Sequence, residues 1–330
     1  MRAARHLLAL LFAASALLLV ACGGSEESAA PPAEPVAAKP ADFPSAQGKT
    51  RQELIAGLKE GPVFAPSTSI LTVGDNRFGF ALFDAAQKQV EASAVAIYTS
   101  RKDGSDLQGP YPARRESFAV KSPFRSAQAA GDLANGDAFY VVGALPFKTA
   151  GNRVLTALAR MDGRLVAAAG FELPVHESGG PPNIGEKAID MHTLTPEDVG
   201  GDLTKLTTRV PADKDLVSTD LADVLGKKPV VLLFATPQLC ASRVCGPVTD
   251  IVEQVRAESG DGVAFIHQEI YNDNQVSKGT RPQVNTYRLP TEPWLFAIDK
   301  SGKIIARFEG AFSANELTRV VDKLKASSKS

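Results

Sequence analysis

Two cysteines, Cys240 and Cys245, are the residues of this chain whose type and spacing best suit chemistry. They follow an apolar run at 230–234, which predicts a buried strand, and precede a segment at 248–255 whose valines and isoleucine recur at helical spacing. A cysteine between a strand and the start of a helix lies near the positive end of the helix dipole, which stabilises a thiolate. The pattern therefore predicts a reactive thiol pair.

The order of the two residues predicts their roles. Cys240 is the candidate nucleophile, and Cys245 is the candidate resolving thiol that releases a mixed disulfide. Five residues of continuous α-helix rise ~7.5 Å, which exceeds the usual ~4.4 to 6.8 Å between the Cα atoms of a disulfide. A bridge therefore requires a broken helix. Either Pro247 is the first helical residue and both cysteines lie in the loop before it, or one turn containing Cys240 unwinds on oxidation. Arg243 is either a cation that lowers a thiol pKa or a solvated loop residue.

The third cysteine, Cys22, has a different context. Residues 1–21 have the charged, apolar and small-residue order of an export signal, and they end just before this cysteine in the manner of a bacterial lipoprotein. We expect lipid on Cys22 and a location in the bacterial cell envelope, anchored to the membrane on its extracytoplasmic side. Thiols can be oxidised in this location. With Cys22 lipidated, Cys240 and Cys245 are the two cysteines of the sequence that remain for an internal disulfide.

The remaining sequence divides into four further parts. Residues 22–62 form an Ala/Pro-rich tether with a short helix at 51–59. Residues 63–176 contain many short β-type runs, which predict an all-β immunoglobulin-like sandwich with Phe78 and Phe80 facing its core. The expected strands are 69–73, 76–84, 92–98, 117–120, 138–144, 152–161 and 164–171, with a hairpin turn at Asp162–Gly163. A Gly/Pro linker covers 177–184.

Residues 185–326 show an α/β pattern. We expect strands at 230–234, 263–271, 293–299 and 304–308, and a last helix that opens with the capping box of Ser313 and Glu316. The fold class is therefore an α/β C-terminal domain preceded by an all-β sandwich. The net charge of −1 leaves no basic patch for nucleic acid.

From about Gly185 to Lys325 the chain resembles the thioredoxin superfamily. The order of strand, cysteine motif, helix, strand, proline, strand, turn, strand and helix carries the resemblance, and the segments 185–188 and 221–231 are similar to the lead-in of TlpA and ResA type proteins and of peroxiredoxins. The spacing of the pair here is C-x4-C rather than C-x2-C, and some peroxiredoxins carry a C-x4-C pair.

The resemblance implies a cis-proline that faces the active-site disulfide, and Pro293 is the candidate, with Pro290 as a competing position. It also implies that Glu292 lies beside the pair, where its charge tunes a thiol pKa or contacts the substrate. Trp294 is expected in the core.

The resemblance implies a thiol–disulfide oxidoreductase whose partners are protein thiols or disulfides and a redox partner, with no cofactor and no metal. Three alternatives stay open. One is a non-enzymatic binding or scaffold lipoprotein with a structural disulfide, and another is a thiol peroxidase. The third is a Sco-like copper protein that uses both cysteines with His267, because soft thiolates and an imidazole suit Cu(I). His267 shares a strand face with Glu269. Neither the cysteine spacing nor the histidine position of Sco-type proteins matches this chain.

Overall fold

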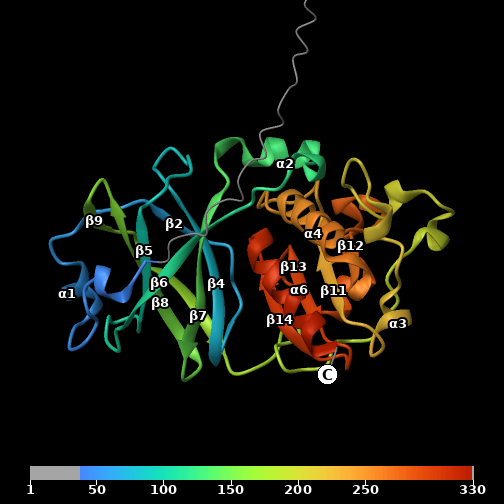
Figure 1. Cartoon of the computed structure of the whole chain (residues 1–330). Coiled ribbons are helices and arrows are strands. Elements are labelled where there is room, and N and C mark those ends of the chain that lie inside the picture. The colour runs from blue at the N-terminus through green and yellow to red at the C-terminus, as the bar shows by residue number, and fades with distance from the viewer. Residues whose placement is uncertain (1–37, 329–330) are drawn as a thin grey trace, which may run out of the picture. The chain divides into compact units, whose positions relative to one another are not determined.

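The structure, a computed structural model, describes residues 38–328 of the 330. The predicted signal peptide, Cys22 and the first part of the tether lie outside the described residues. Most of the chain, Pro35–Ser330, forms one compact unit that contains a ten-stranded and a four-stranded sheet (Figure 1). Of the helices in the described range, none has the length and apolar character needed to cross a membrane.

The larger sheet folds into two layers that share one strand. Its strands are β1 (Lys59–Glu60), β2 (Val63–Pro66), β3 (Leu71–Thr72), β4 (Gly74–Phe83), β5 (Ala94–Ser100), β6 (Gln108–Ser117), β7 (Ala138–Phe147), β8 (Gly151–Met161), β9 (Arg164–Ala167) and β10 (Phe171–His176). The first half of β6 pairs with β5 and its second half pairs with β7. One layer is therefore β2–β4–β7–β6, and the other is β6–β5–β8 with β9 and β10. The strand pairing therefore gives a two-layered β-structure in which β6 belongs to both layers.

The core of the sandwich is built by alternation along the strands. Phe78, Phe80 and Leu82 of β4 are fully buried in it, together with Tyr140 and Val142 of β7. The two phenylalanines thus face the core, as predicted. The residues between them point to the opposite face of the layer, because successive side chains of a strand alternate.

The strand predictions agree with β3, β4, β5, β7, β8 and β9, but they missed β1, β2, most of β6 and most of β10, and they were wrong at 117–120. The hairpin at Asp162–Gly163 joins β8 to β9 as expected. No strand covers 117–120; β6 instead ends at Ser117, and the chain continues into an insert at 118–135 that contains helix α2 (Ala127–Asp132). Pro110 and Pro112 obscured β6 in the sequence, since prolines cannot donate to a sheet ladder and argue against a strand.

The predicted tether is folded over its last part. Phe43 and Ala46 are buried against Tyr98 and Leu158 of the sandwich, and the Tyr98 hydroxyl donates to the Pro44 carbonyl at 2.6 Å. Helix α1 (Arg51–Ile55) is shorter than expected. Residues 38–62 are therefore a packed segment of the compact unit, not a tether, because their few apolar side chains find a matching surface.

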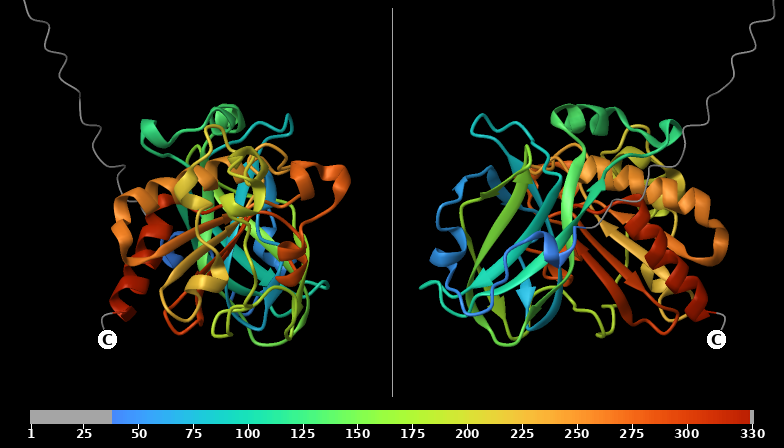
Figure 2. Two further views of the ribbon diagram at one scale, coloured as in Figure 1. Left: turned by 90° about the vertical axis from the view of Figure 1, so that its right-hand side faces the viewer. Right: turned by 60° about the vertical axis from the view of Figure 1, so that its left-hand side comes forward.

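The smaller sheet has the strand order β12–β11–β13–β14, in which β11 is parallel to β12 and antiparallel to β13. Its elements are α3 (Leu221–Val224), β11 (Val230–Phe234), α4 (Cys245–Ser259), β12 (Ala264–Gln268), α5 (Pro282–Thr286), β13 (Trp294–Ile298), β14 (Ile304–Glu309) and α6 (Ala314–Ser328). Helices α4 and α6, orange and red in Figure 2, lie on one face of the sheet. The segment 188–191 packs on the other face, together with α3 and α5. The four strands and helices α4 and α6 match the expected elements to within a few residues, whereas α3 and α5 were not expected.

Helix α6 begins as predicted. Ser313 Oγ accepts from the backbone N–H of Glu316, and the Glu316 carboxylate accepts from the N–H of Ser313. Its buried residues are Leu317, Val320, Val321 and Leu324, together with Glu316. Trp294 is also in the core, at 1% exposed.

Side chains from the sandwich enter the core of the C-terminal part. Phe139 and Val141, on the outer face of β7, belong to the same buried cluster as Phe308 and Phe312. Beside this contact, Arg77 of β4 makes two hydrogen bonds of 3.0 and 2.8 Å to the carboxylate of Glu316. The two sheets are therefore joined by a continuous apolar core and a largely buried ion pair.

Candidate active site around Cys240 and Cys245

The two cysteines lie between a fully buried strand and a long helix. All five residues of β11 are buried, which fixes the start of the loop at 235–244. Helix α4 begins at Cys245, and the N–H of Val248 makes an early helical bond to the Val244 carbonyl at 3.0 Å. Cys240 lies in the loop, so the pair does not share one unbroken helix. The prediction that Pro247 would be the first helical residue is wrong by two positions; Pro247 is the third, where its missing N–H still costs no helical bond.

Cys240 is the half-buried thiol of the pair, and neither cysteine is in a disulfide. The pKa of Cys240 is lowered to about 7, first by a hydrogen bond from the Cys245 thiol. Further donors are the Ser242 hydroxyl, 3.2 Å from Sγ, and the backbone N–H of Cys245. Burial and the charge of Glu292 oppose them. Three donors, two of them from Cys245, the first residue of α4, therefore favour a thiolate at Cys240.

Cys245 has the opposite surroundings. Its side chain is fully buried, and burial, followed by the interactions with Cys240, raises its pKa well above the usual value. A thiol with a high pKa remains protonated, so Cys245 can donate its hydrogen bond to Cys240. The two thiols thus differ in both access and acidity.

Glu292 and Pro293 lie at the start of β13, close to the pair. The Glu292–Pro293 peptide bond is cis, and the bond before Pro290 is not among the cis bonds of the described residues. Glu292 is half-buried, and burial, then the charge of Glu269, raises its pKa. Its charge acts on both cysteines. The pKa of Tyr271 is raised by burial first, and then by the charges of Glu292 and both cysteines. Tyr271 therefore also lies near this site.

Arg243 is exposed and has a left-handed backbone, with φ of 59°. Its charge acts on Asp132 of the insert, where it favours the ionised carboxylate against the effect of burial, which raises the pKa of Asp132. Arg243 is not among the main causes of the lowered pKa of Cys240. Arg243 is thus an exposed loop residue whose charge acts on Asp132 of the insert.

His267 and Glu269 are both buried but belong to separate contacts. The His267 ring bonds through Nε2 to the Ala235 carbonyl at 3.0 Å, and burial lowers its pKa. Glu269 accepts from the N–H and hydroxyl of Thr208 at 2.8 and 2.9 Å. Among residues 38–328, no group of three or more His, Cys, Asp and Glu side chains is arranged to hold a metal ion. The geometry therefore does not bring His267 together with the cysteines as the copper alternative requires.

The insert at 118–135 packs directly on the cysteine helix. Ser126 donates from its N–H and its hydroxyl to Asp250 of α4, at 2.7 and 2.9 Å. The other carboxylate oxygen of Asp250 accepts from Arg209 Nε at 2.9 Å. At Gly246, an added Cβ would lie 3.0 Å from a carboxylate oxygen of Asp132. A side chain at position 246 would therefore require the Asp132 carboxylate to shift by a few tenths of an ångström.

Sequence reasoning missed several of these residues. Ser242 lies between the cysteines, and its position in that motif was a usable signal for a thiolate donor. Arg209 and Asp250 gave no signal, because they are 41 residues apart and neither belongs to a motif. Their pairing with Ser126 depends on how the insert folds onto α4.

A cleft of about 1010 Å³ opens beside the cysteine loop. The loop contributes Ser242, Arg243 and Val244, and the segment before Pro293 contributes Thr291 and Glu292. The opposite wall comes from the sandwich, through β2, β4 and β7. The half-buried thiol of Cys240 is two residues from this cleft along the chain.

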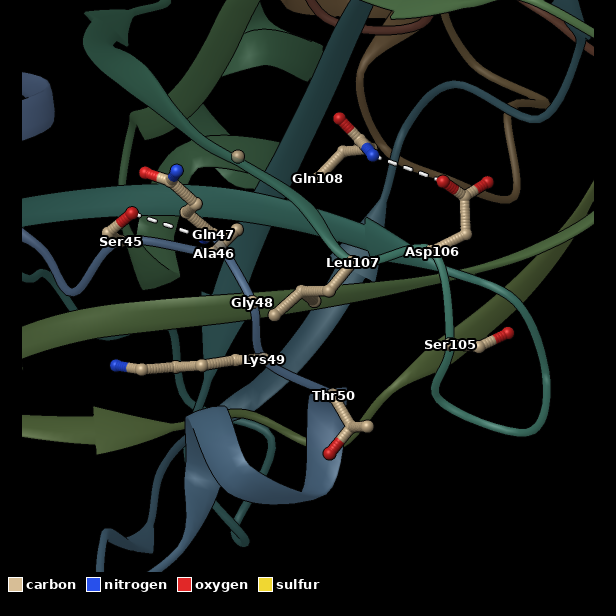
Figure 3. Close-up of a pocket in the computed structure, with 11 residues that line it drawn as sticks. Ser45, Ala46, Gln47, Gly48, Lys49, Thr50, Ser105, Asp106, Leu107 and Gln108 are labelled. Atoms are coloured by element: carbon tan, nitrogen blue, oxygen red, sulfur yellow. Dashed lines mark hydrogen bonds between the residues drawn. The ribbon is translucent and has the colours of Figure 1, made fainter.

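Another hollow, shown in Figure 3, lies in the sandwich part, between the segment Ser45–Thr50 and the residues before and at the start of β6. Its volume is about 620 Å³. Its charged side chains are Lys49 and Asp106, which point away from each other, and its eleven lining residues include no cysteine or histidine. It offers no comparable chemistry.

The reactivity of Cys240 should depend on pH in a way that its neighbours control. We expect the rate of alkylation by iodoacetamide to rise through about pH 7, because only the thiolate reacts. Glu292→Gln removes a negative charge that disfavours the thiolate, so the midpoint should move to lower pH. Ser242→Ala removes a donor and should move it to higher pH. Glu197→Gln, an exposed acid outside the site, serves as the control; a midpoint that rises in Glu292→Gln would contradict the assignment.

Comparisons with known proteins complete this description. No model of a known protein family matches the chain, and no curated protein matches it. Among solved structures, a thiol:disulfide interchange protein of the thioredoxin family from Chlorobium tepidum TLS is similar at 14% identity over 45% of this chain and 99% of its own, with a TM-score of 0.31.

Two further solved structures are also similar. The Lin-41 filamin domain matches at 14% identity over 36% of this chain and 99% of its own, with a TM-score of 0.20. A chicken TCR matches at 13% identity over 52% of this chain and 80% of its own, with a TM-score of 0.19. The chain itself is β-rich, and at these scores none of the three similar structures says what it does.

Proposed function

We propose that this chain is a membrane-anchored, extracytoplasmic thiol–disulfide oxidoreductase that works through Cys240 and Cys245. In this proposal 185–326 is a thioredoxin-like domain, and the residues of 63–176 are an immunoglobulin-like sandwich that supports it. The observation that carries the proposal is the inequality of the two thiols. One is half-buried with a pKa of about 7, and the other is fully buried with a raised pKa. A nucleophile and a resolving thiol need this division of properties.

The reaction follows from these positions. The Cys240 thiolate attacks one sulfur of a substrate disulfide, forms a mixed disulfide and releases the other substrate sulfur as a thiolate. Cys245 then loses its proton and attacks the Cys240 sulfur, so that the Cys240–Cys245 disulfide forms and the second substrate thiolate leaves. Two electrons pass from the protein to the substrate. An external dithiol returns the pair to the reduced form, and the reverse sequence oxidises a substrate dithiol.

Glu292 is the group best suited to take the proton from Cys245. Its charge acts on both sulfurs, and burial raises its pKa above the usual value. A carboxylate with a raised pKa is a stronger base, and general bases work best when their pKa approaches the working pH. In this proposal the residue before Pro293 accepts the proton of the resolving thiol.

The location is proposed from the N-terminal sequence. Residues 1–21 would be removed and Cys22 would carry the lipid, which would place the redox domain outside the cytoplasm. The redox partner and the substrate would then be protein thiols or disulfides of the cell envelope.

The reduction potential of the pair tests the proposed function. The full-length protein is equilibrated in thiol–disulfide buffers of defined potential, and the free thiols are alkylated and counted. We expect a midpoint between about −120 and −270 mV, the range of exchange proteins. A midpoint below about −300 mV would identify a structural disulfide instead. Peroxide consumption faster than disulfide exchange would favour the peroxidase alternative.

A further inference from the structure

The outer face of the β2–β4–β7 layer carries apolar residues on all three strands, beside Arg77 of β4, which pairs with Glu316. The two faces of a strand alternate, and an antiparallel sheet with one solvated face normally carries polar residues on it. Here Phe139 and Val141 of β7 are buried in the contact with the C-terminal part. Further across the layer, Ala81 and Phe83 of β4 and Val63 of β2 line the cleft. The apolar face therefore continues beyond the contact and forms a wall of the cleft.

The cleft lies between this wall and the cysteine loop at 235–244. Its volume of about 1010 Å³ is at the upper limit of the ~300–1,000 Å³ typical of small-molecule sites. Strand β2 lines it and is the last strand of its layer, and Val63 is 56% exposed. An edge strand next to an apolar wall suits an extended polypeptide better than a compact small molecule.

The charged side chains of the cleft are mostly acidic. Asp84, Asp132, Glu292 and Glu309 line it, and among the described residues that line it Arg243 is the one basic residue. Charge complementarity across an interface selects partners and speeds their encounter. The cleft should therefore favour a ligand with basic groups beside its apolar ones, and it should disfavour anionic ligands.

We propose that this cleft binds an extended segment of the substrate protein, with apolar side chains against β2 and β4 and basic side chains toward the carboxylates, so that the substrate cysteine reaches Cys240. The inference deepens the proposed function and rests on it. It assigns substrate selection to the sandwich, while the exchange itself remains at the two cysteines. The preferred substrate is a cysteine in a basic and apolar sequence.

The test compares peptide disulfides with the reduced full-length protein. Two peptides share one cysteine and the same apolar residues, and they differ only in having lysines or glutamates as flanks. Each carries a thionitrobenzoate leaving group, so that the attack of Cys240 is followed by absorbance. We expect the lysine peptide to react at least about tenfold faster at low salt. The difference should shrink at 1 M salt, where the screening length falls to about 3 Å.

Two variants locate the effect. Val63→Arg places a cation in the cleft and should slow the lysine peptide about tenfold. Val276→Arg, at a valine of matching 55% exposure outside the cleft, should leave its rate unchanged. As a second measurement, a cysteine-free lysine peptide should slow the reaction by competition. Equal rates for the two peptides, or equal effects of the two variants, would overturn the docking site.

The same assay separates the two proposals. If a small disulfide such as dithionitrobenzoate reacts at Cys240 but the peptides show no preference, the docking site is wrong and the exchange function stands. If Cys240 exchanges with neither the small disulfide nor the peptides, the proposed function itself fails.

Discussion

The Cys240→Ser variant is expected to lose disulfide exchange, with a rate at least about a thousandfold below that of the unchanged protein, which corresponds to about 4 kcal/mol in the barrier. The reason is chemical, because a serine hydroxyl stays protonated where the Cys240 thiol, with its pKa of about 7, is half ionised at neutral pH. The buried Cys245 cannot substitute, since its pKa is raised and its side chain is 0% exposed. Release of thiol from a peptide disulfide measures the rate.

Cys245→Ser is the matched variant for this prediction. It keeps the nucleophile and removes the resolving thiol, so a mixed disulfide between Cys240 and the substrate should accumulate and be visible as a mass increase under non-reducing conditions. It also removes the Cys245 thiol, the largest of the donors that lower the pKa of Cys240. Reversed behaviour, with trapping in Cys240→Ser, would make Cys245 the nucleophile and contradict the assignment.

Arg209→Met is expected to lower the free energy of unfolding by about 3–5 kcal/mol, the cost of leaving buried charges without a partner. Arg209 is 4% exposed, and it bonds Asp250, which is fully buried. It also forms an ion pair with Glu253 and donates to the Phe124 carbonyl at 3.0 Å. Burial already raises the pKa of Asp250 against the effect of Arg209. Urea unfolding followed by circular dichroism measures the change.

An exposed ion pair provides the control for Arg209. Arg115 bonds Glu91 through two nitrogens, but these side chains are 43% and 53% exposed. Arg115→Met should therefore cost only about 0–1 kcal/mol. Equal losses of unfolding free energy in the two variants would contradict this prediction, because they would show that solvent can replace the contacts of Arg209.

The Arg209 network also connects stability to the site. Arg209 donates to the carbonyl of Phe124, and Ser126 donates to Asp250. These hydrogen bonds hold the insert of the sandwich on α4, the helix that begins at Cys245. The sandwich is therefore more than a spacer. It covers the first turns of the cysteine helix and provides one wall of the cleft beside it.

Local pattern was enough to predict the four strands and the two long helices of the C-terminal part. Strand β11 matches the apolar run at 230–234, and helix α6 begins at the capping box of Ser313 and Glu316. Such features involve residues within a few positions of each other, so they can be read from one segment. The same is true of the buried alternation of Phe78 and Phe80 in β4.

The sequence by itself thus determined the thiol pair, its position between a strand and a helix, and most of the secondary structure. Only the tertiary structure decided what surrounds the pair. Asp132 meets Gly246 across 114 positions, and Ser126 meets Asp250 across 124. Contacts at such separation depend on how the insert, the outer face of β4 and β7, and α4 pack together. No local pattern encodes these contacts, because the residues next to each partner in the sequence look like those of an ordinary surface loop.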